Sequence, residues 1–193
     1  MPKGIHEVIA LIEAPQITPA YMFALLLAGS LGTNILALIV AIIFSVGMQL
    51  ASLLFYIRTM DTDLFISDRK KRAPLFAVAI ISYAIGVVIL YFINAPFIVT
   101  ALMISYVINT IVASTINHFD KVSIHTWSIS GPAVALFYQY GIVVFACAIA
   151  VAFLVGYSRV RAKAHSIRQV LLAVAVSVPL TIFVVYILAP AII

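Results

Sequence analysis

Residues 73–119 read APLFAVAIISYAIGVVILYFINAPFIVTALMISYVINTIVASTINHF and contain no Asp, Glu, Lys or Arg. A charge at the centre of a bilayer costs about 2.5–3.5 kcal/mol, so such a run indicates membrane-spanning helix. One crossing needs about 20 residues, and this stretch is long enough for two. Asn94-Ala95-Pro96 lies in its middle and predicts the turn between them, because Asn and Pro favour turn geometry.

Three further uncharged runs cover residues 14–57, 122–157 and 169–193. The first predicts two helices with a break at residues 29–34, and the second predicts two shorter helices that fold back near residues 139–141. The last predicts one helix, with Pro179 as a candidate kink. We therefore expect an all-α fold: a polytopic integral membrane helix bundle of about six to seven transmembrane helices. It forms a single transmembrane domain over residues 1–193.

The composition agrees with this fold class. Hydrophobic residues make up 65% of the chain and charged residues 9%, against roughly 25% charged in soluble domains. The net charge of +5 is accounted for by the enrichment of Lys and Arg in cytoplasmic loops of membrane proteins. No nucleic-acid-binding motif accompanies it, so we expect membrane lipids and not nucleic acid as partners.

Hairpins return a chain to the side that it left, so the segments 1–13, 58–72, 118–121 and 158–168 are predicted on one face. All 11 Lys and Arg lie in them: Lys3, Arg58, Arg69, Lys70, Lys71, Arg72, Lys121, Arg159, Arg161, Lys163 and Arg168. Basic loops stay in the cytoplasm. We therefore predict a multi-pass protein of the cell membrane with this face cytoplasmic, the N-terminus inside and the C-terminus outside.

Three clusters on this face carry candidate chemistry: SDRKKRAP (67–74), DKVSIH (120–125) and YSRVRAKAHSIRQ (157–169). Taken singly, each is typical of a topology anchor. Together they bring His125 and His165, each at the start of an apolar segment, to the same face as several arginines. Arginine binds phosphate oxygens in bidentate fashion, and helix N-termini favour anions. Two histidines with arginines are the groups needed for phosphoryl transfer, one as nucleophile and one as general acid.

The third cluster resembles the last signature of the type 2 phosphatidic acid phosphatase superfamily: Ser-Arg, five residues, His, three residues, Asp. Ser158, Arg159 and His165 match it in identity and spacing. The second cluster resembles the family's Pro-Ser-Gly-His signature, with Ser123 and His125 matching. The first loosely resembles the opening signature, Lys, six residues, Arg-Pro. Arg72 would be its arginine, and Arg69 or Lys70 would replace the family lysine.

The resemblance implies an integral membrane phosphatase that hydrolyses a lipid phosphate or a polyprenyl (isoprenoid) diphosphate without a metal or other cofactor. His165 would form a phosphohistidine, and His125 would protonate the leaving oxygen. Six residues would bind the phosphate: Arg72, Arg69, Lys121, Ser123, Ser158 and Arg159. The histidines are scattered along the chain and show no metal-ligand spacing.

The main departure from the family is Gln169, which stands where the family has the Asp that orients the nucleophilic histidine. A Gln carbonyl accepts from an imidazole N–H but carries no charge, and the analogous Asp-to-Asn change in a serine protease costs about 10⁴ in rate. Either a carboxylate such as Asp68 or Asp120 substitutes, or the enzyme is slow, or the protein is not an enzyme. A phosphotransferase of the same family and a non-catalytic lipid-phosphate-binding protein therefore remain alternatives.

Overall fold

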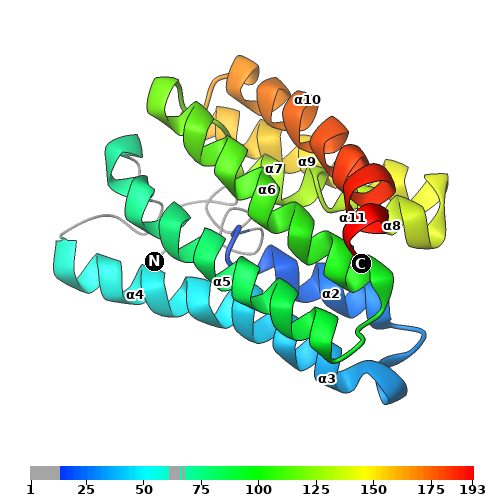
Figure 1. Ribbon diagram of the computed structural model, residues 1–193. Helices are drawn as coiled ribbons and strands as arrows, with labels where there is room; N and C mark the ends of the chain where they lie inside the picture. The colour runs from blue at the N-terminus through cyan, green and yellow to red at the C-terminus, as the bar shows by residue number, and fades with distance from the viewer. Residues whose placement is uncertain (1–13, 61–65, 67) are drawn as a thin grey trace.

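The computed structural model describes residues 14–60, 66 and 68–193, and all regular secondary structure in this part of the chain is helical (Figure 1). In chain order the elements are α2 (Thr18–Leu27), α3 (Leu31–Ile42), η1 (Ile43–Gly47), α4 (Met48–Met60), η2 (Arg69–Arg72), α5 (Ala73–Phe92), α6 (Phe97–Phe119), α7 (Ile124–Ser130), α8 (Ala133–Tyr140), α9 (Ile142–Arg161), α10 (Ile167–Phe183), η3 (Val184–Leu188) and α11 (Ala189–Ile192). The expected all-α class is confirmed for these residues.

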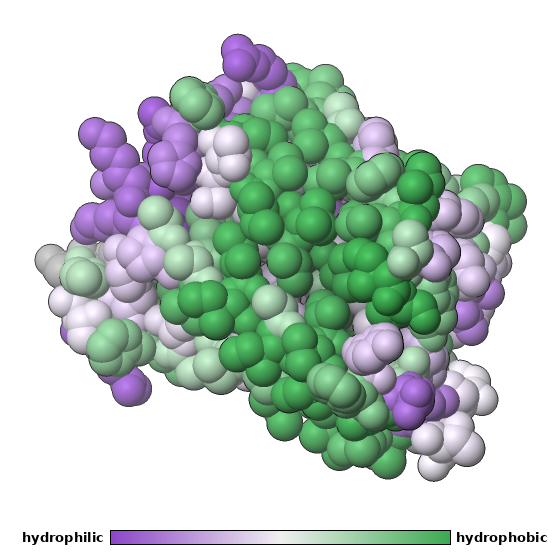
Figure 2. Space-filling view, viewed as in Figure 1, coloured by the Kyte–Doolittle hydropathy of each residue, from purple (hydrophilic) through white to green (hydrophobic). Residues whose placement is uncertain are grey.

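Five helical stretches are long and apolar enough to cross a membrane: Gly32–Met60, Arg69–Phe92, Phe97–Phe119, Ile142–Arg161 and Ile167–Ile192. Many large hydrophobic side chains are exposed, and hydrophobic residues cover much of the middle of the face shown in Figure 2. Water would not favour so much exposed apolar surface, whereas lipid tails would. The architecture is therefore consistent with a multi-pass membrane protein.

The expected count of six to seven crossings is not confirmed, because two of the apolar segments are short. Helix α2 has 10 residues, which is about 15 Å of helix. The segment 124–140 is divided into α7 and α8 at Gly131-Pro132, since proline lacks the backbone N–H that a continuous helix needs. Helix α7 is buried throughout apart from Ile124, which is half-buried, so it lies inside the bundle.

The turns lie where the sequence predicts them. Asn94, between α5 and α6, has a left-handed φ of 53°, and Gly141, between α8 and α9, has φ 81°. Asn and Gly are the residues that adopt this conformation most readily. A third turn at residues 28–30 joins α2 to α3, close to the predicted break. Helix α10 continues through Pro179.

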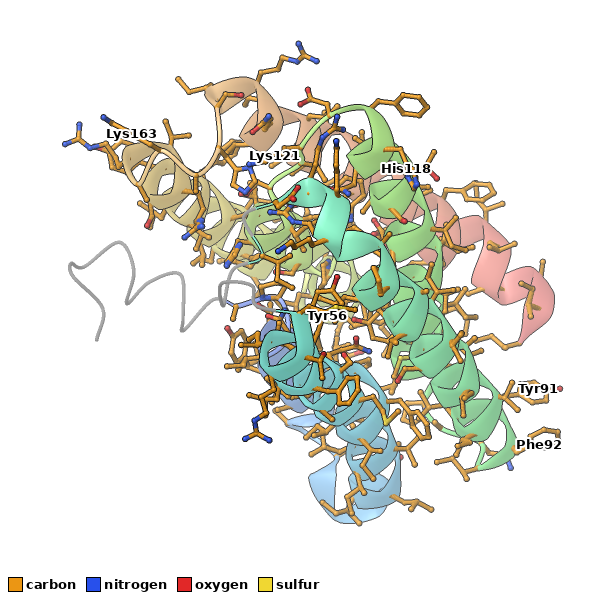
Figure 3. All side chains as sticks on the ribbon, turned by 90° about the vertical axis from the view of Figure 1, so that its left-hand side faces the viewer. Tyr56, Tyr91, Phe92, His118, Lys121 and Lys163 are labelled. Carbon is orange, nitrogen blue, oxygen red and sulfur yellow. The ribbon has the colours of Figure 1, made fainter. Side chains whose placement is uncertain are left out.

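One end of the bundle, on the left and upper left in Figure 1, holds the end of α4, the start of α5 and the connections α6–α7 and α9–α10. We call it the basic end, defined by its Lys and Arg residues: Arg58, Arg69, Lys70, Lys71, Arg72, Lys121, Arg159, Arg161, Lys163 and Arg168. Figure 3 shows Lys121 and Lys163 at this end, and Tyr91 and Phe92 at the opposite one. The predicted gathering of the charged segments on one face is thus observed for the described residues; Lys3 lies outside them.

Candidate functional site

A cavity of about 260 Å³ lies at the basic end and extends between α4, α5 and α6. Its polar part is lined by Arg72, His125, Arg159 and His165, which come from the residue before α5, from α7, from α9 and from the loop before α10. Its apolar part is lined by side chains that include Leu50, Leu53, Leu75, Phe76 and Ala79. No carboxylate is among the described residues that line it. The cavity thus combines positive charge and imidazoles with an adjoining hydrophobic space.

The end of α9 sets the spacing between Arg159 and His165. The N–H of Ala164 donates to the Arg159 carbonyl at 3.0 Å, and the N–H of Lys163 donates to the Val160 carbonyl at 2.9 Å. These are the bonds of a Schellman motif, which needs a left-handed residue just past the helix. Lys163 occupies that position with φ 56°. The motif turns the chain back, so that His165 and Arg159 line the same cavity.

Gly156 allows α9 to approach the segments that carry His125 and Gln169. A Cβ at this position would lie 2.4 Å from Val170 Cγ1 and 3.2 Å from Thr126 Oγ1. Thr126 directly follows His125 on α7, and Val170 directly follows Gln169 on α10. The close packing of three helices at a glycine therefore determines how near Arg159 comes to the two histidines.

Arg72 stands just before α5, which begins with Ala73-Pro74, and its Nε donates to the Ile66 carbonyl at 2.9 Å. Proline suits the first turn of a helix because it has no N–H to leave unsatisfied there. The hydrogen bond helps to hold the guanidinium side chain in the wall of the cavity. Arg159 is buried, and both guanidinium groups lie close enough to His165 to act on its charge.

His165 lies outside the membrane-length helices and is half-buried. Burial, the largest cause, lowers its pKa to about 4. The hydrogen bond with Gln169, second in size, acts in the opposite direction, and the positive charges of Arg72, Arg159 and Lys121 add to the lowering. At neutral pH its imidazole is therefore uncharged and has a lone pair available. That is the state required of a nucleophile.

Gln169 links His165 to a carboxylate. Its Oε1 lies 3.2 Å from His165 Nδ1, and its Nε2 donates to Asp120 Oδ1 at 3.1 Å. The second oxygen of Asp120 accepts from Arg168 at 3.0 Å. Asp68, the other carboxylate that could replace the family Asp, accepts instead from the Lys70 backbone N–H at the start of η2. Asp120 is thus the one that the structure connects to the histidine.

The remaining predicted phosphate ligands do not line the cavity. Arg69 donates to the carbonyls of Asn117 and His118 at 3.0 and 2.8 Å, so it caps the end of α6. Ser123 is buried with its Oγ 3.0 Å from Thr126 Oγ1, and Ser158 is buried within α9. Lys121 lies on a shallower surface hollow with Asp120 and acts on His165 through its charge.

The expected anion site at the start of α10 is occupied by the protein itself. Ser166 Oγ accepts from the Gln169 N–H at 3.3 Å, and Gln169 Oε1 accepts from the Ser166 N–H at 3.2 Å. This reciprocal pair is a capping box, which satisfies the donors that an anion would otherwise use. Among the described residues, no three His, Cys, Asp or Glu side chains are grouped so that they could hold a metal ion.

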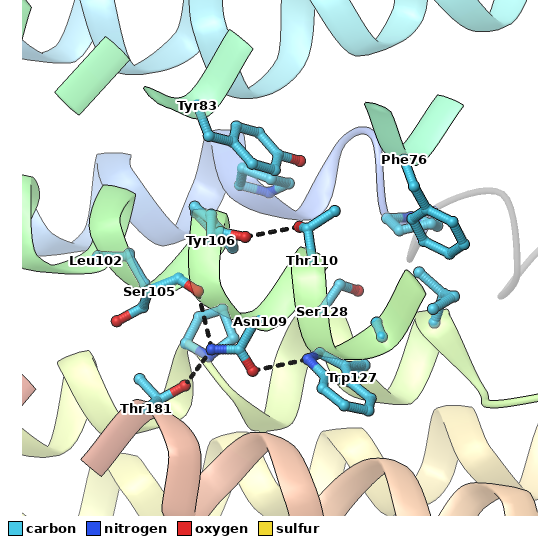
Figure 4. A pocket seen from close by; sticks show the side chains of 15 residues that line it. Phe76, Tyr83, Leu102, Ser105, Tyr106, Asn109, Thr110, Trp127, Ser128 and Thr181 are labelled. Atoms are coloured by element: carbon cyan, nitrogen blue, oxygen red, sulfur yellow. Dashed lines mark hydrogen bonds between the residues drawn. The ribbon is translucent and has the colours of Figure 1, made fainter. Parts of the chain in front are cut away.

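A second polar cluster lies deeper in the bundle (Figure 4). Asn109 Nδ2 donates to the Ser105 carbonyl at 2.9 Å and to Thr181 Oγ1 at 3.0 Å, and its Oδ1 accepts from Trp127 Nε1 at 2.8 Å. Beside it, Ser130 Oγ and Ser177 Oγ are 2.7 Å apart. These bonds join α6, α7 and α10. We call this group the Asn109 network, defined by Ser105, Asn109, Trp127 and Thr181.

No protein-family model, curated protein or solved structure matches the chain. The site therefore has to be interpreted from its own geometry. Sequence reasoning missed Gly156 and the Lys163 turn. The pair Ala152 and Gly156, four residues apart on an apolar helix, is the pattern that could have indicated the close helix contact.

Proposed function

We propose that this protein is an integral membrane phosphatase that hydrolyses a lipid phosphate or a polyprenyl diphosphate through a phosphohistidine. The observation that carries the proposal is that one cavity is lined by all four of these residues: His125, His165, Arg72 and Arg159. These residues are far apart in the chain, and the fold brings together the two histidines and two of the arginines that phosphoryl transfer requires.

The positions of the side chains support the following steps. The phosphoryl oxygens bind between the guanidinium groups of Arg72 and Arg159. The lone pair of His165 Nε2 attacks phosphorus, a P–N bond forms and the P–O bond to the lipid breaks. Protonated His125 gives its proton to the leaving oxygen. Neutral His125 then takes a proton from water, whose oxygen attacks phosphorus, breaks the P–N bond and releases inorganic phosphate.

The apolar part of the cavity supports a lipid as the substrate. Leu50, Leu53 and Leu75 line the same space as the two histidines. A hydrocarbon chain placed there stays out of water while its phosphate meets the positive groups. A water-soluble phosphate ester would gain nothing from these contacts. The positive-inside rule supports a cytoplasmic position for the basic end in the cell membrane.

A phosphate-release assay on the full chain in detergent tests this function. The substrates are phosphatidic acid, phosphatidylglycerophosphate and a polyprenyl diphosphate, each with and without a chelator. We expect chelator-resistant release from at least one of them, lost in His165→Ala and in His125→Ala. His118→Ala is the matched control, because His118 bonds the Ser114 carbonyl of its own helix and does not line the cavity.

Three other outcomes have different meanings. Transfer of phosphate to an added alcohol or lipid in place of release would identify the phosphotransferase alternative. Binding of the lipid without turnover, in protein shown to be folded, would support the non-catalytic alternative. Release that persists in His165→Ala would contradict the phosphohistidine mechanism.

A further inference from the structure

We infer that Asp120 is a positioning residue that, acting through the amide of Gln169, holds the proton of His165 on Nδ1 and leaves Nε2 free towards the cavity. The catalytic consequence rests on the proposed function, whereas the protonation state of the imidazole does not. The inference begins with the order of groups along the chain of hydrogen bonds: Asp120, Gln169, His165.

The orientation of a glutamine amide is normally ambiguous, because its oxygen and nitrogen are nearly alike in shape. Here the hydrogen-bond partners of Gln169 determine the orientation of its amide. The Asp120 carboxylate only accepts, so the atom 3.1 Å from it has to be the NH₂ group. The Ser166 backbone N–H only donates, so the atom 3.2 Å from it has to be the oxygen. Both neighbours require the same orientation of Gln169.

That orientation places an acceptor, Gln169 Oε1, 3.2 Å from His165 Nδ1. A neutral imidazole has one donor and one acceptor nitrogen. Because Oε1 accepts, Nδ1 carries the hydrogen and Nε2 carries the lone pair. A carboxylate that accepts directly from one imidazole nitrogen commonly fixes the tautomer of a functional histidine in this way. In this chain the Gln169 amide lies between the Asp120 carboxylate and the His165 imidazole, so the carboxylate fixes the tautomer indirectly.

Asp120 has a competing structural role, since its other oxygen binds Arg168. The ion pair joins the α6–α7 connection to the start of α10. It is exposed, with 81% of the Arg168 side chain accessible, and exposed pairs contribute little to stability. A variant of Arg168 therefore separates the two roles. It removes the ion pair and keeps the bond from Gln169 to Asp120.

The test uses ¹⁵N-histidine-labelled full-length protein in detergent at pH 7, where His165 is neutral. We would record imidazole ¹⁵N spectra and assign His165 by its loss in His165→Ala. We expect a pure Nδ1–H tautomer in the parent protein and in Arg168→Ala, and a mixture of tautomers in Asp120→Ala. Asp120→Asn, whose amide oxygen still accepts from Gln169, should keep most of the Nδ1–H form.

Kinetics provide the second readout. In Asp120→Ala we expect kcat to fall about 10-fold with KM nearly unchanged, since partners that orient a reactive histidine contribute factors of this size. Asp120→Asn should retain most of the rate, and Arg168→Ala should stay within about 2-fold because the pair is exposed. An equal loss in Asp120→Ala and Arg168→Ala, or an Nε2–H tautomer in the parent protein, would overturn the inference. An inactive parent protein that shows the Nδ1–H tautomer would refute the proposed function and leave the inference standing.

Discussion

The Asn109 network joins α6, α7 and α10, and the cavity at the basic end is lined by neighbouring residues of α6 and α7 together with α4, α5 and α9. These two polar regions differ in composition. In the network, neutral groups satisfy one another: Asn109 alone bonds the Ser105 carbonyl, Thr181 and Trp127. In the cavity, Arg72 and Arg159 meet two histidines, and no carboxylate is among the described lining residues.

The difference indicates which region serves structure and which binds a ligand. A satisfied set of neutral donors and acceptors lowers the cost of polar groups inside an apolar bundle. A gathering of cationic groups beside an open space attracts an anion that enters it, because opposite charges attract. We therefore expect changes in the network to affect mainly stability, and changes in the cavity to affect mainly activity.

Among the variants that test this comparison, Arg159→Gln gives the largest expected effect. Removing one group that stabilises the charge of the transition state costs about 10²–10³ in kcat. We expect a loss near 10³-fold in phosphate release and a much smaller effect on the unfolding midpoint, because glutamine keeps a long polar side chain at this position. Arg161→Gln, which changes an exposed arginine of the same helix, is the matched control. A large fall in the midpoint would place Arg159 with the structural residues.

Gly156→Ala tests whether helix packing sets the geometry of the cavity. The new Cβ would meet Val170 Cγ1 at 2.4 Å, so α9 has to move. Overpacking of this kind costs about 1–3 kcal/mol. Misplacing reacting groups by about 1 Å can reduce the rate by about 100-fold. Phosphate release and thermal unfolding measure both effects. The double variant Gly156→Ala with Val170→Ala should recover much of the activity, and a failure to do so would count against this packing account.

Asn109→Leu tests the other side of the comparison. Leucine has a similar shape but leaves Trp127 Nε1 and Thr181 Oγ1 without their bonds to Asn109. An unsatisfied buried polar group costs about 1–3 kcal/mol, so we expect a loss of this size in the free energy of unfolding, measured in mixed micelles. The kcat of the folded fraction should stay close to that of the parent protein. A drop in kcat as large as that of Arg159→Gln would contradict the conclusion that the Asn109 network serves structure and the cavity binds a ligand.

The pH dependence sharpens the account of the cavity. The pKa of His165 is lowered to about 4 from 6.5, so its imidazole stays neutral and nucleophilic at mildly acidic pH. We therefore expect that protonation of His165 reduces kcat/KM only as the pH approaches 4. The same shift makes the unfolded state bind a proton between pH 6.5 and 4 that the folded state does not, so stability falls as the pH falls through that window.

Lys121→Gln removes one of the charges that lower the pKa of His165, so its titration, followed by NMR, should move to higher pH. Lys163→Gln, which changes an exposed lysine of the loop before α10, is the control. Equal shifts in the two variants would contradict the assigned electrostatics.

Lys163→Gly gives the smallest expected effect. Lys163 has φ 56°, and this left-handed conformation costs a non-glycine residue about 1–2 kcal/mol. Glycine removes that strain but is more flexible in the unfolded chain, so a net gain of about 1 kcal/mol or less is expected. Unfolding measures this gain in stability. Activity, measured in parallel by phosphate release, should not change. A loss of activity would show that the lysine charge takes part in catalysis.

The sequence predicted most of the fold because hydrophobic runs and turn residues act locally. A few local residues determine each of the turns at Asn94 and Gly141. The same holds for the charged segments that lie together at the basic end. The number of crossings depends on how short apolar segments pack, and Gly131-Pro132 divides one of them in a way that hydropathy alone does not reveal.

The candidate site was predictable only in part. The sequence predicts four site residues that the structure places on one cavity: Arg72, His125, Arg159 and His165. Arg69 was predicted to bind phosphate and caps α6 instead, because nothing in a run of basic residues tells which side chain turns inward. The link from Asp120 to Gln169 joins two segments that only the folded chain brings together.

The most direct test of the central claim is to trap the covalent intermediate. The full chain would be mixed with phosphatidic acid or a polyprenyl diphosphate labelled with ³²P, quenched in base within the first turnover, and digested for mass spectrometry. We predict an acid-labile, base-stable phosphate on His165 that is absent from His165→Ala and persists longer in His125→Ala. Turnover of the same substrate with no phosphate on His165, or with phosphate on another residue, would contradict the account.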